Sequence, residues 1–123
     1  GAARTLFLKV SGSHAKYVYE RFGHDIKFCH IDESGGDNVV GFACVNVMLS
    51  PTFFRWLFGM GGAVKLAKPK GKRWVGSFPN AVASDFESYM RDYEAAAEGY
   101  KAALEAAILQ MGSEERQRRD NLD

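Results

Sequence analysis

Two β-type runs, 25–32 and 38–48, follow one another in the middle of the chain. Only the polar turn Ser34-Gly35-Gly36-Asp37 separates them, and glycine-containing turns of this kind join antiparallel strands in hairpins. A third run, 5–10, alternates apolar and polar residues before the hairpin, and a fourth, 63–67, follows it. The chain is therefore expected to form a four-stranded sheet that contains this hairpin.

One helix is expected on each side of the hairpin. Ser13 is a suitable N-cap for a helix that runs to about Phe22, and Ser50-Pro51 opens a second helix that ends at Gly59. The order β-α-β-β-α-β predicts a ferredoxin-like α+β domain over residues 4–79, with an antiparallel four-stranded sheet. Right-handed connections place both helices on one face and leave the other face open unless another segment covers it.

A long helical pattern follows over residues 80–112. Its apolar side chains recur at steps of three and four, which is an a/d-like seam; they are Phe86, Met90, Tyr93, Ala97, Tyr100, Leu104 and Ile108. A helix of about thirty residues is roughly 45 Å long and exceeds the width of so small a domain. We therefore expect the helix to pair with a second copy or with an upstream domain, unless it breaks near Gly99 and folds back. The residues expected to mediate self-association are Tyr93, Tyr100, Leu104 and Ile108. The tail 113–123 is expected to be frayed or disordered.

Length and charge limit the classes of protein to which this chain can belong. A chain of 123 residues with 46% hydrophobic residues supports one packed domain, and it contains no run of eighteen apolar residues that would cross a membrane. Residues 1–79 hold eleven Lys and Arg against five Asp and Glu, whereas residues 80–123 hold five against ten. This asymmetry does not by itself identify nucleic acid as a partner.

The cellular compartment is predicted from targeting signals and cysteine content. With no recognisable signal peptide and only two cysteines, the expected compartment is the cytoplasm, and no membrane partner is expected.

Catalytic and metal chemistry find little support in the sequence. Cys29 and His30 are adjacent on a strand, so they point to opposite faces, and no Cys-x-x-Cys or His-x-x-x-His pair occurs. No nucleophile motif accompanied by a base is present. The chain is expected not to be an enzyme and to bind neither a metal nor a cofactor.

The densest basic cluster begins in the run 63–67 and continues into the irregular stretch 68–79; it consists of Lys65, Lys68, Lys70, Lys72 and Arg73 with Trp74. The stretch 68–79 is expected to form a loop or to hold a short strand at 73–75. Cations interleaved with an aromatic ring suit a phosphate backbone or a nucleotide, and a solvated loop is the alternative. The candidate ligand-binding residues are Lys65, Lys70, Lys72, Arg73 and Trp74, with Arg55 on the second helix as a separate candidate.

The open sheet face is a second candidate surface. Phe7, Lys9 and Phe42 are expected there, in runs that partly match the two RNA-stacking motifs of RRM domains. Those motifs also need a cation at Val40 and aromatic residues at Cys44 and Val47, and this chain lacks all three. The face is therefore expected either to bind single-stranded nucleic acid or to pack against a neighbouring domain or a second protomer.

Several motifs together resemble one family. The resemblance is to the C-terminal extension, of the WCX type, found in WYL-domain transcriptional regulators. It rests on 50–62, a Phe- and Trp-rich helix with a glycine-rich stop, followed by a strand and Pro69. The matching runs are 6–10, 15–18, 20–23, 50–62 and 64–66, within a stretch that covers roughly residues 5–100.

The resemblance implies a C-terminal fragment of a longer bacterial regulator, with a winged helix-turn-helix and a WYL domain upstream. Gly1-Ala2 is then expected to include a cloning scar. The implied function is a regulatory module that holds dimers together and helps couple an effector, such as a nucleotide or oligonucleotide, to DNA binding. DNA would be contacted only through the missing domain. The helix beyond Tyr93 and the basic stretch after Pro69 are longer than the family implies.

Overall fold

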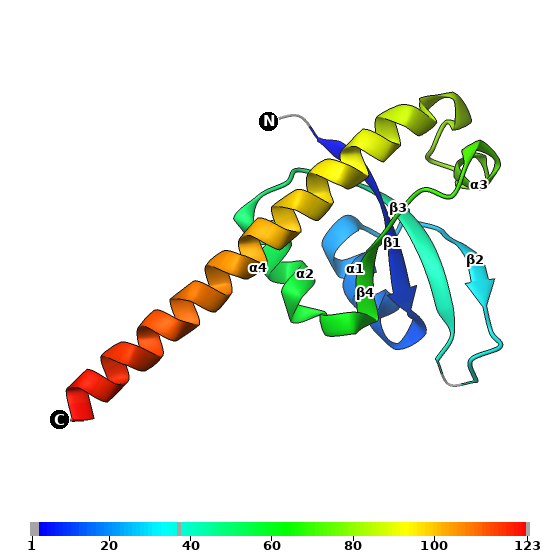
Figure 1. Ribbon diagram of the computed structural model, residues 1–123. Helices are drawn as coiled ribbons and strands as arrows, with labels where there is room; N and C mark the ends of the chain where they lie inside the picture. Colours follow the sequence, from blue (N-terminus) through cyan, green and yellow to red (C-terminus); the bar gives the residue numbers. More distant parts are fainter. Residues whose placement is uncertain (1–2, 37, 123) are drawn as a thin grey trace.

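The computed structural model describes residues 3–36 and 38–122 and has one sheet flanked by helices (Figure 1). The strands are β1 (Arg4–Ser11), β2 (Phe28–Asp32), β3 (Val40–Val47) and β4 (Val64–Ala67). The helices are α1 (Ala15–Phe22), α2 (Pro51–Gly59), α3 (Lys72–Gly76) and α4 (Phe86–Leu122). Short 3-10 turns at Gly12–His14, Gly61–Ala63 and Ala83–Asp85 precede α1, β4 and α4. Asp37 of the expected turn and the segment Gly1-Ala2 lie outside the described residues.

The four strands form one antiparallel sheet in the order β2-β3-β1-β4. β1 is central, and its Leu8 lies opposite Ala43 of β3 and Leu66 of β4. β2 begins later than the sequence predicted and contains a register shift between Cys29 and Asp32, where His30 has a φ of 52°. The predicted α+β class, the antiparallel four-stranded sheet and the long C-terminal helix are confirmed.

α1 and α2 cover one face of the sheet. The core there consists of alternate strand residues and the inner faces of the helices; its largest members are Leu6, Leu8, Val10, Val18, Val45, Phe53, Phe54 and Leu57. α2 begins as predicted, because Ser50 Oγ accepts a hydrogen bond from the Phe53 N–H at 3.2 Å and Pro51 takes the first helical turn. Ser13 does not cap α1, because a 3-10 turn leads into that helix instead.

The second sheet face is half covered by the chain's own segment 72–89. A second core cluster forms there from Phe7, Cys44, Val75, Phe78 and Tyr89. Phe7 is 2% exposed, so the prediction of an open face at this residue is corrected. The basic stretch forms no strand at 73–75; it folds into α3 and returns across the sheet, which buries Val75 and Phe78 on Phe7.

α4 is continuous through Gly99, so the alternative of a helix that folds back does not hold. Its first half packs on the domain, where Ala96 is buried and the ring of Tyr100 lies 4.9 Å from that of Phe58. Its second half projects away from the domain, orange to red in Figure 1. The helix reaches Leu122, whereas the sequence predicted a frayed tail after residue 112, and an Arg119–Glu115 pair lies in its last turns.

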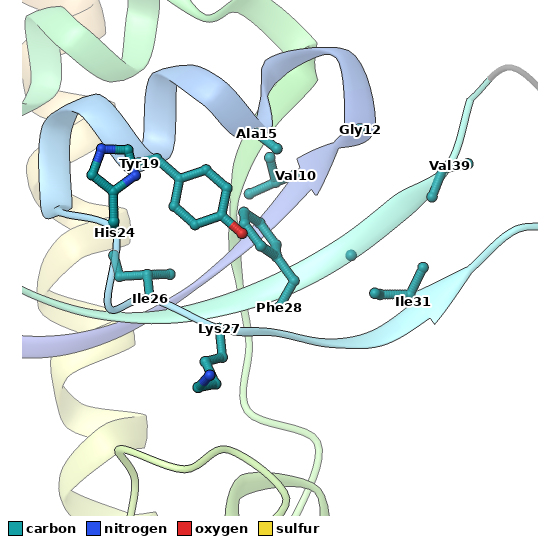
Figure 2. Close-up of a pocket in the computed structure, with 11 residues that line it drawn as sticks. Val10, Gly12, Ala15, Tyr19, His24, Ile26, Lys27, Phe28, Ile31 and Val39 are labelled. Carbon is teal, nitrogen blue, oxygen red and sulfur yellow. The ribbon is translucent and has the colours of Figure 1, made fainter.

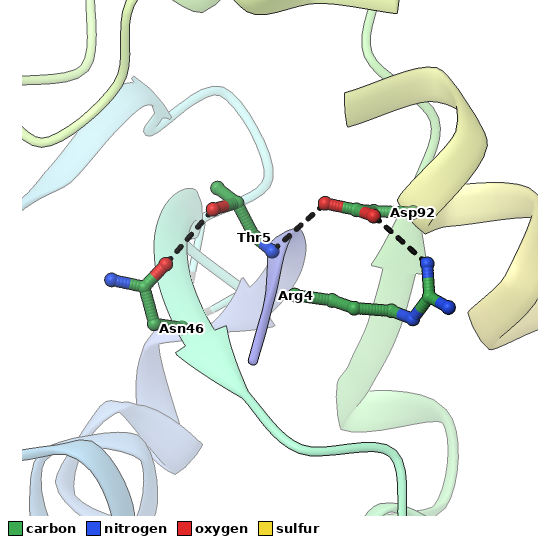
Figure 3. Close-up of polar contacts among 4 residues, drawn as sticks. All are labelled: Arg4, Thr5, Asn46 and Asp92. Carbon is green, nitrogen blue, oxygen red and sulfur yellow. Dashed lines mark hydrogen bonds and ion pairs between the residues drawn. The ribbon is translucent and has the colours of Figure 1, made fainter. Parts of the chain in front are cut away.

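Asp92 fastens α4 to β1 (Figure 3). Its Oδ1 accepts a hydrogen bond from Arg4 Nη1 and its Oδ2 accepts one from the Thr5 N–H, both at 3.1 Å. β4 pairs with β1 only from Phe7 onward, so the Thr5 N–H lies beyond the end of that ladder. The carboxylate therefore satisfies a backbone donor that no strand reaches.

Replacing Asp92 with asparagine is expected to lower the free energy of unfolding by about 1 kcal/mol, because a charge-assisted hydrogen bond becomes a neutral one. Urea unfolding followed by circular dichroism measures the change. Glu94→Gln is the matched control, since Glu94 is exposed on the same helix and should change stability by less than about 0.5 kcal/mol. Equal effects of the two substitutions would contradict the role assigned to Asp92.

Candidate functional site

The uncovered half of the second sheet face carries the candidate site. Residues two apart on a strand share a face, so Lys9 follows Phe7 on β1 and Phe42 precedes Cys44 on β3. The register places Lys9 between Phe42 on one side and Lys65 of β4 on the other. We call this area the basic sheet surface; it consists of Lys9, Val40, Phe42, Lys65, Ala67 and Lys70.

Lys70 reaches the basic sheet surface from the loop between β4 and α3. Its Nζ lies 5.0 Å from the ring centroid of Phe42 and 5.9 Å from that of Trp74. The adjacent Pro69 is buried and anchors the loop. Cation–π attraction of about 0.5–1 kcal/mol at such an exposed site holds the ammonium group beside the rings. Lys70 therefore adds a third cation to Lys9 and Lys65, and it lies beside the aromatic ring of Phe42.

Three shallow depressions cross the basic sheet surface. Their volumes are about 580, 390 and 310 Å³, and Lys9 lines all three. The depression on the β2 side is also lined by His30 and Asp32. Hydrogen bonds from the hydroxyl and the N–H of Ser34 hold the pKa of Asp32 below its ordinary value, and Lys9 acts in the same direction. The depressions thus extend from a carboxylate at β2 to a pair of ammonium groups at β1 and β4.

The structure unites residues that the sequence assigned to two separate candidates. Lys9 and Phe42 were expected on the open face, and Lys65, Lys70 and Trp74 in the basic cluster. In the fold, Lys65 lies opposite Lys9, and Lys70 lies over Phe42. Trp74 borders the β2-side depression. Strand register supplies the connection, which sequence spacing does not reveal.

The other candidate residues lie elsewhere. Lys72 and Arg73 are exposed on α3 and line none of these three depressions. Arg55 is exposed on α2, which packs on the opposite face of the sheet. Phe7 is covered, so the expected stacking pair of Phe7 and Phe42 is reduced to Phe42.

The two cysteines are free thiols on the partly covered face. Burial raises the pKa of Cys44 to about 12, with a further contribution from Cys29, and burial also raises the pKa of Cys29. Such thiols stay protonated near neutral pH and are poor nucleophiles. Within residues 3–36 and 38–122, no three His, Cys, Asp or Glu side chains gather as a group able to hold a metal ion.

A pocket that the sequence did not reveal lies between α1 and the β2–β3 hairpin (Figure 2). Its volume is about 500 Å³, within the range of small-molecule sites. Tyr19 forms its aromatic wall, with its ring 5.3 Å from Phe28 and 5.8 Å from His24. Gly41 lies on the β3 side, where an added Cβ would meet Phe28 at 3.4 Å. Only the packing of α1 over β3 places these residues together.

No helix in the described part of the chain is both long enough and apolar enough to cross a membrane. No protein-family model, no curated protein and no solved structure matches this chain significantly. The fold and the surface chemistry are therefore the observations from which function is inferred.

Proposed function

We propose that this chain is the C-terminal regulatory module of a bacterial WYL-type transcriptional regulator that acts in the cytoplasm. In this proposal the module holds two copies of the regulator together through α4. It also helps pass effector binding to a DNA-binding region outside this chain. The observation that carries the proposal is the apolar stripe of α4, which continues beyond the domain.

The ferredoxin-like class is part of the proposal. The element order β-α-β-β-α-β and the strand order β2-β3-β1-β4 support it. The motif on which the family resemblance rests, residues 50–62, forms the Ser-capped helix α2 and the turn into β4. Phe53, Phe54 and Leu57 of this motif are buried in the core, so these three aromatic and apolar positions serve the fold.

The apolar stripe of α4 has two parts with different surroundings. Tyr93 and Tyr100 are half-buried and, with Leu57 and Leu66, line a depression on their own domain. Leu104 and Ile108 are 40% and 58% exposed, and the helix beyond Leu104 extends for about 27 Å. Exposed apolar side chains at helical spacing form a face suited to a partner helix.

Charge favours a second copy as the partner. An antiparallel pair of α4 helices centred on Ile108 would bring Lys101 toward Glu115 of the other copy. Both charged side chains are exposed. Such a contact is isologous, so each favourable pair occurs twice. An effector that binds one arrangement of the dimer more tightly would shift the population of arrangements, and with it the affinity for DNA.

Replacing Leu104 and Ile108 together with lysine is expected to convert a dimer into a monomer. The substitutions remove apolar contact at the centre of the pair and bring like charges together. Light scattering behind a size-exclusion column measures the mass. Circular dichroism is expected to show a folded domain, because both residues lie outside the core.

Leu109→Lys is the matched control. Leu109 is 72% exposed but lies five residues from Leu104 and therefore on a different helix face, so the dimer should persist. A wild-type chain that stays monomeric, or a dimer that survives the double substitution, would contradict self-association through α4. A chain stopped at Tyr93 is unsuitable, because it would lose Ala96 and Tyr100 from the packing on the domain.

A further inference from the structure

The cross-strand pair Lys9–Lys65 is unfavourable for folding by itself. The register places the two residues directly opposite each other on antiparallel strands, where like charges are destabilising. Among the residues that the structure describes, the ion pairs are Arg4–Asp92 and Arg119–Glu115, so neither Lys9 nor Lys65 is in an ion pair with a described carboxylate. Asp32 attracts Lys9 without forming an ion pair with it. Two like charges opposite each other without an ion-pair partner break a local rule, and such breaks are typical of functional sites. An anion bound between the two lysines would supply that partner.

A third ammonium group and an aromatic ring adjoin the pair. Lys70 comes from a different segment, yet its Nζ lies over Phe42, the neighbour of Lys9 on β3. Phe42 is half-buried, so its ring is held by its surroundings while part of it faces the depressions. Lys9 and Lys70 therefore adjoin the ring of Phe42, and Lys65 lies on the far side of Lys9.

We propose that the basic sheet surface binds a nucleotide, either free or as a unit of a single-stranded nucleic acid. The phosphate lies between Lys9 and Lys65, where lysine acts as a point charge for it. The base stacks on Phe42, an interaction of the kind found where aromatic residues line single-strand sites. Lys70 exchanges its contact with Phe42 for the phosphate and so uncovers the ring.

The order of chemical groups across the sheet determines which end of the nucleotide lies toward β2 and which lies toward β4. Asp32 lies at the β2 edge opposite Val40, and the neighbouring cross-strand row holds Phe42 on β3, Lys9 on β1 and Lys65 on β4. Asp32 keeps its negative charge to a lower pH than an ordinary aspartate, so it repels phosphate and accepts hydrogen bonds from amino groups of a base. An inorganic anion would use the lysines and leave Phe42 without a role.

The inference goes beyond the proposed function, because it names a ligand class and does not depend on pairing of α4. The probes are adenosine monophosphate, inorganic phosphate and a labelled oligodeoxythymidine of about twelve nucleotides. Calorimetry and fluorescence anisotropy on the full chain are expected to show binding of the mononucleotide, of the oligonucleotide, or of both. Inorganic phosphate alone is expected to bind about tenfold more weakly or not at all.

The double variant Lys9→Gln/Lys65→Gln is expected to weaken binding by about tenfold or more and to reduce the dependence of affinity on salt. Its melting temperature should not fall, because the substitution removes a repulsive pair. Phe42→Leu should weaken binding of the base-containing probes and leave the salt dependence unchanged. Lys72→Gln/Arg73→Gln removes the same charge from α3, outside the surface, and should change affinity by less than about threefold.

A response to the oligonucleotide alone assigns the surface to strands, and a response to the mononucleotide assigns it to a free effector. Failure of both probes to bind would overturn the inference. So would an equal loss in the α3 control, or phosphate binding as tightly as the nucleotide. Light scattering on the same variants separates this result from the proposed function, because the dimer is expected to persist in all of them.

Discussion

Replacing Phe7 with alanine is expected to lower the free energy of unfolding by about 3–5 kcal/mol, as for other fully buried phenylalanines. Phe7 lies at the centre of the second core cluster, with its ring centroid 5.0 Å from Trp74, 4.9 Å from Phe78 and 5.7 Å from Tyr89. Removing the ring leaves a cavity that the sheet cannot fill and frees the segment that covers this face. Urea unfolding followed by circular dichroism measures the loss.

Phe42→Ala is the matched control for Phe7→Ala. Phe42 is on the same sheet face but is only half-buried, so its truncation should cost about 1 kcal/mol. If Phe7→Ala costs less than about 1 kcal/mol, segment 72–89 does not pack on the sheet as described. The face would then be open, as the sequence predicted, and Phe7 would be available to a ligand.

Replacing Gly99 with alanine is expected to destabilise the protein by about 2 kcal/mol, although alanine is the better helix former. An added Cβ would lie 2.5 Å from Cζ and 3.0 Å from Cε2 of Phe54. Phe54 is 7% exposed and packs on Phe53, so its ring has little room to move. α4 must therefore shift away from α2, and the cost exceeds the gain of about 1 kcal/mol in helix propensity.

Gly112→Ala is the control that measures the gain in helix propensity alone. Gly112 is on the same helix, but an added Cβ there would meet no atom within 4 Å. This substitution should increase helicity and leave the stability of the domain unchanged or raised. If Gly99→Ala also stabilises the protein, α4 does not approach α2 as closely as described.

The candidate site shows which of its features could be predicted from the sequence. The sequence identified Lys9, Phe42, Lys65 and Lys70, each from its own segment, but it assigned them to two sites. Opposition of Lys9 and Lys65 depends on the pairing of β1 with β4, two strands separated by more than fifty residues. The pocket beside Tyr19 had no signal in the sequence, because Gly41 matters there only once α1 lies over β3.

Local structure was determined by the sequence itself. The alternation in β1, the polar turn of the hairpin, the Ser50-Pro51 start of α2 and the seam of α4 depend on residues within a few positions of one another. Their periodicity and capping chemistry therefore predict them.

Contacts between distant segments were decided only by the tertiary structure. The sequence could not show that α3 would cover Phe7 or that the ring of Phe54 would pack directly against Gly99. Nor could it show that α4 would extend beyond the domain after Ala103. Each depends on where two segments meet, and that is set by the register of the sheet and by the volume of side chains packed between the elements. Burial of apolar surface selects one such arrangement among many that the same local patterns allow.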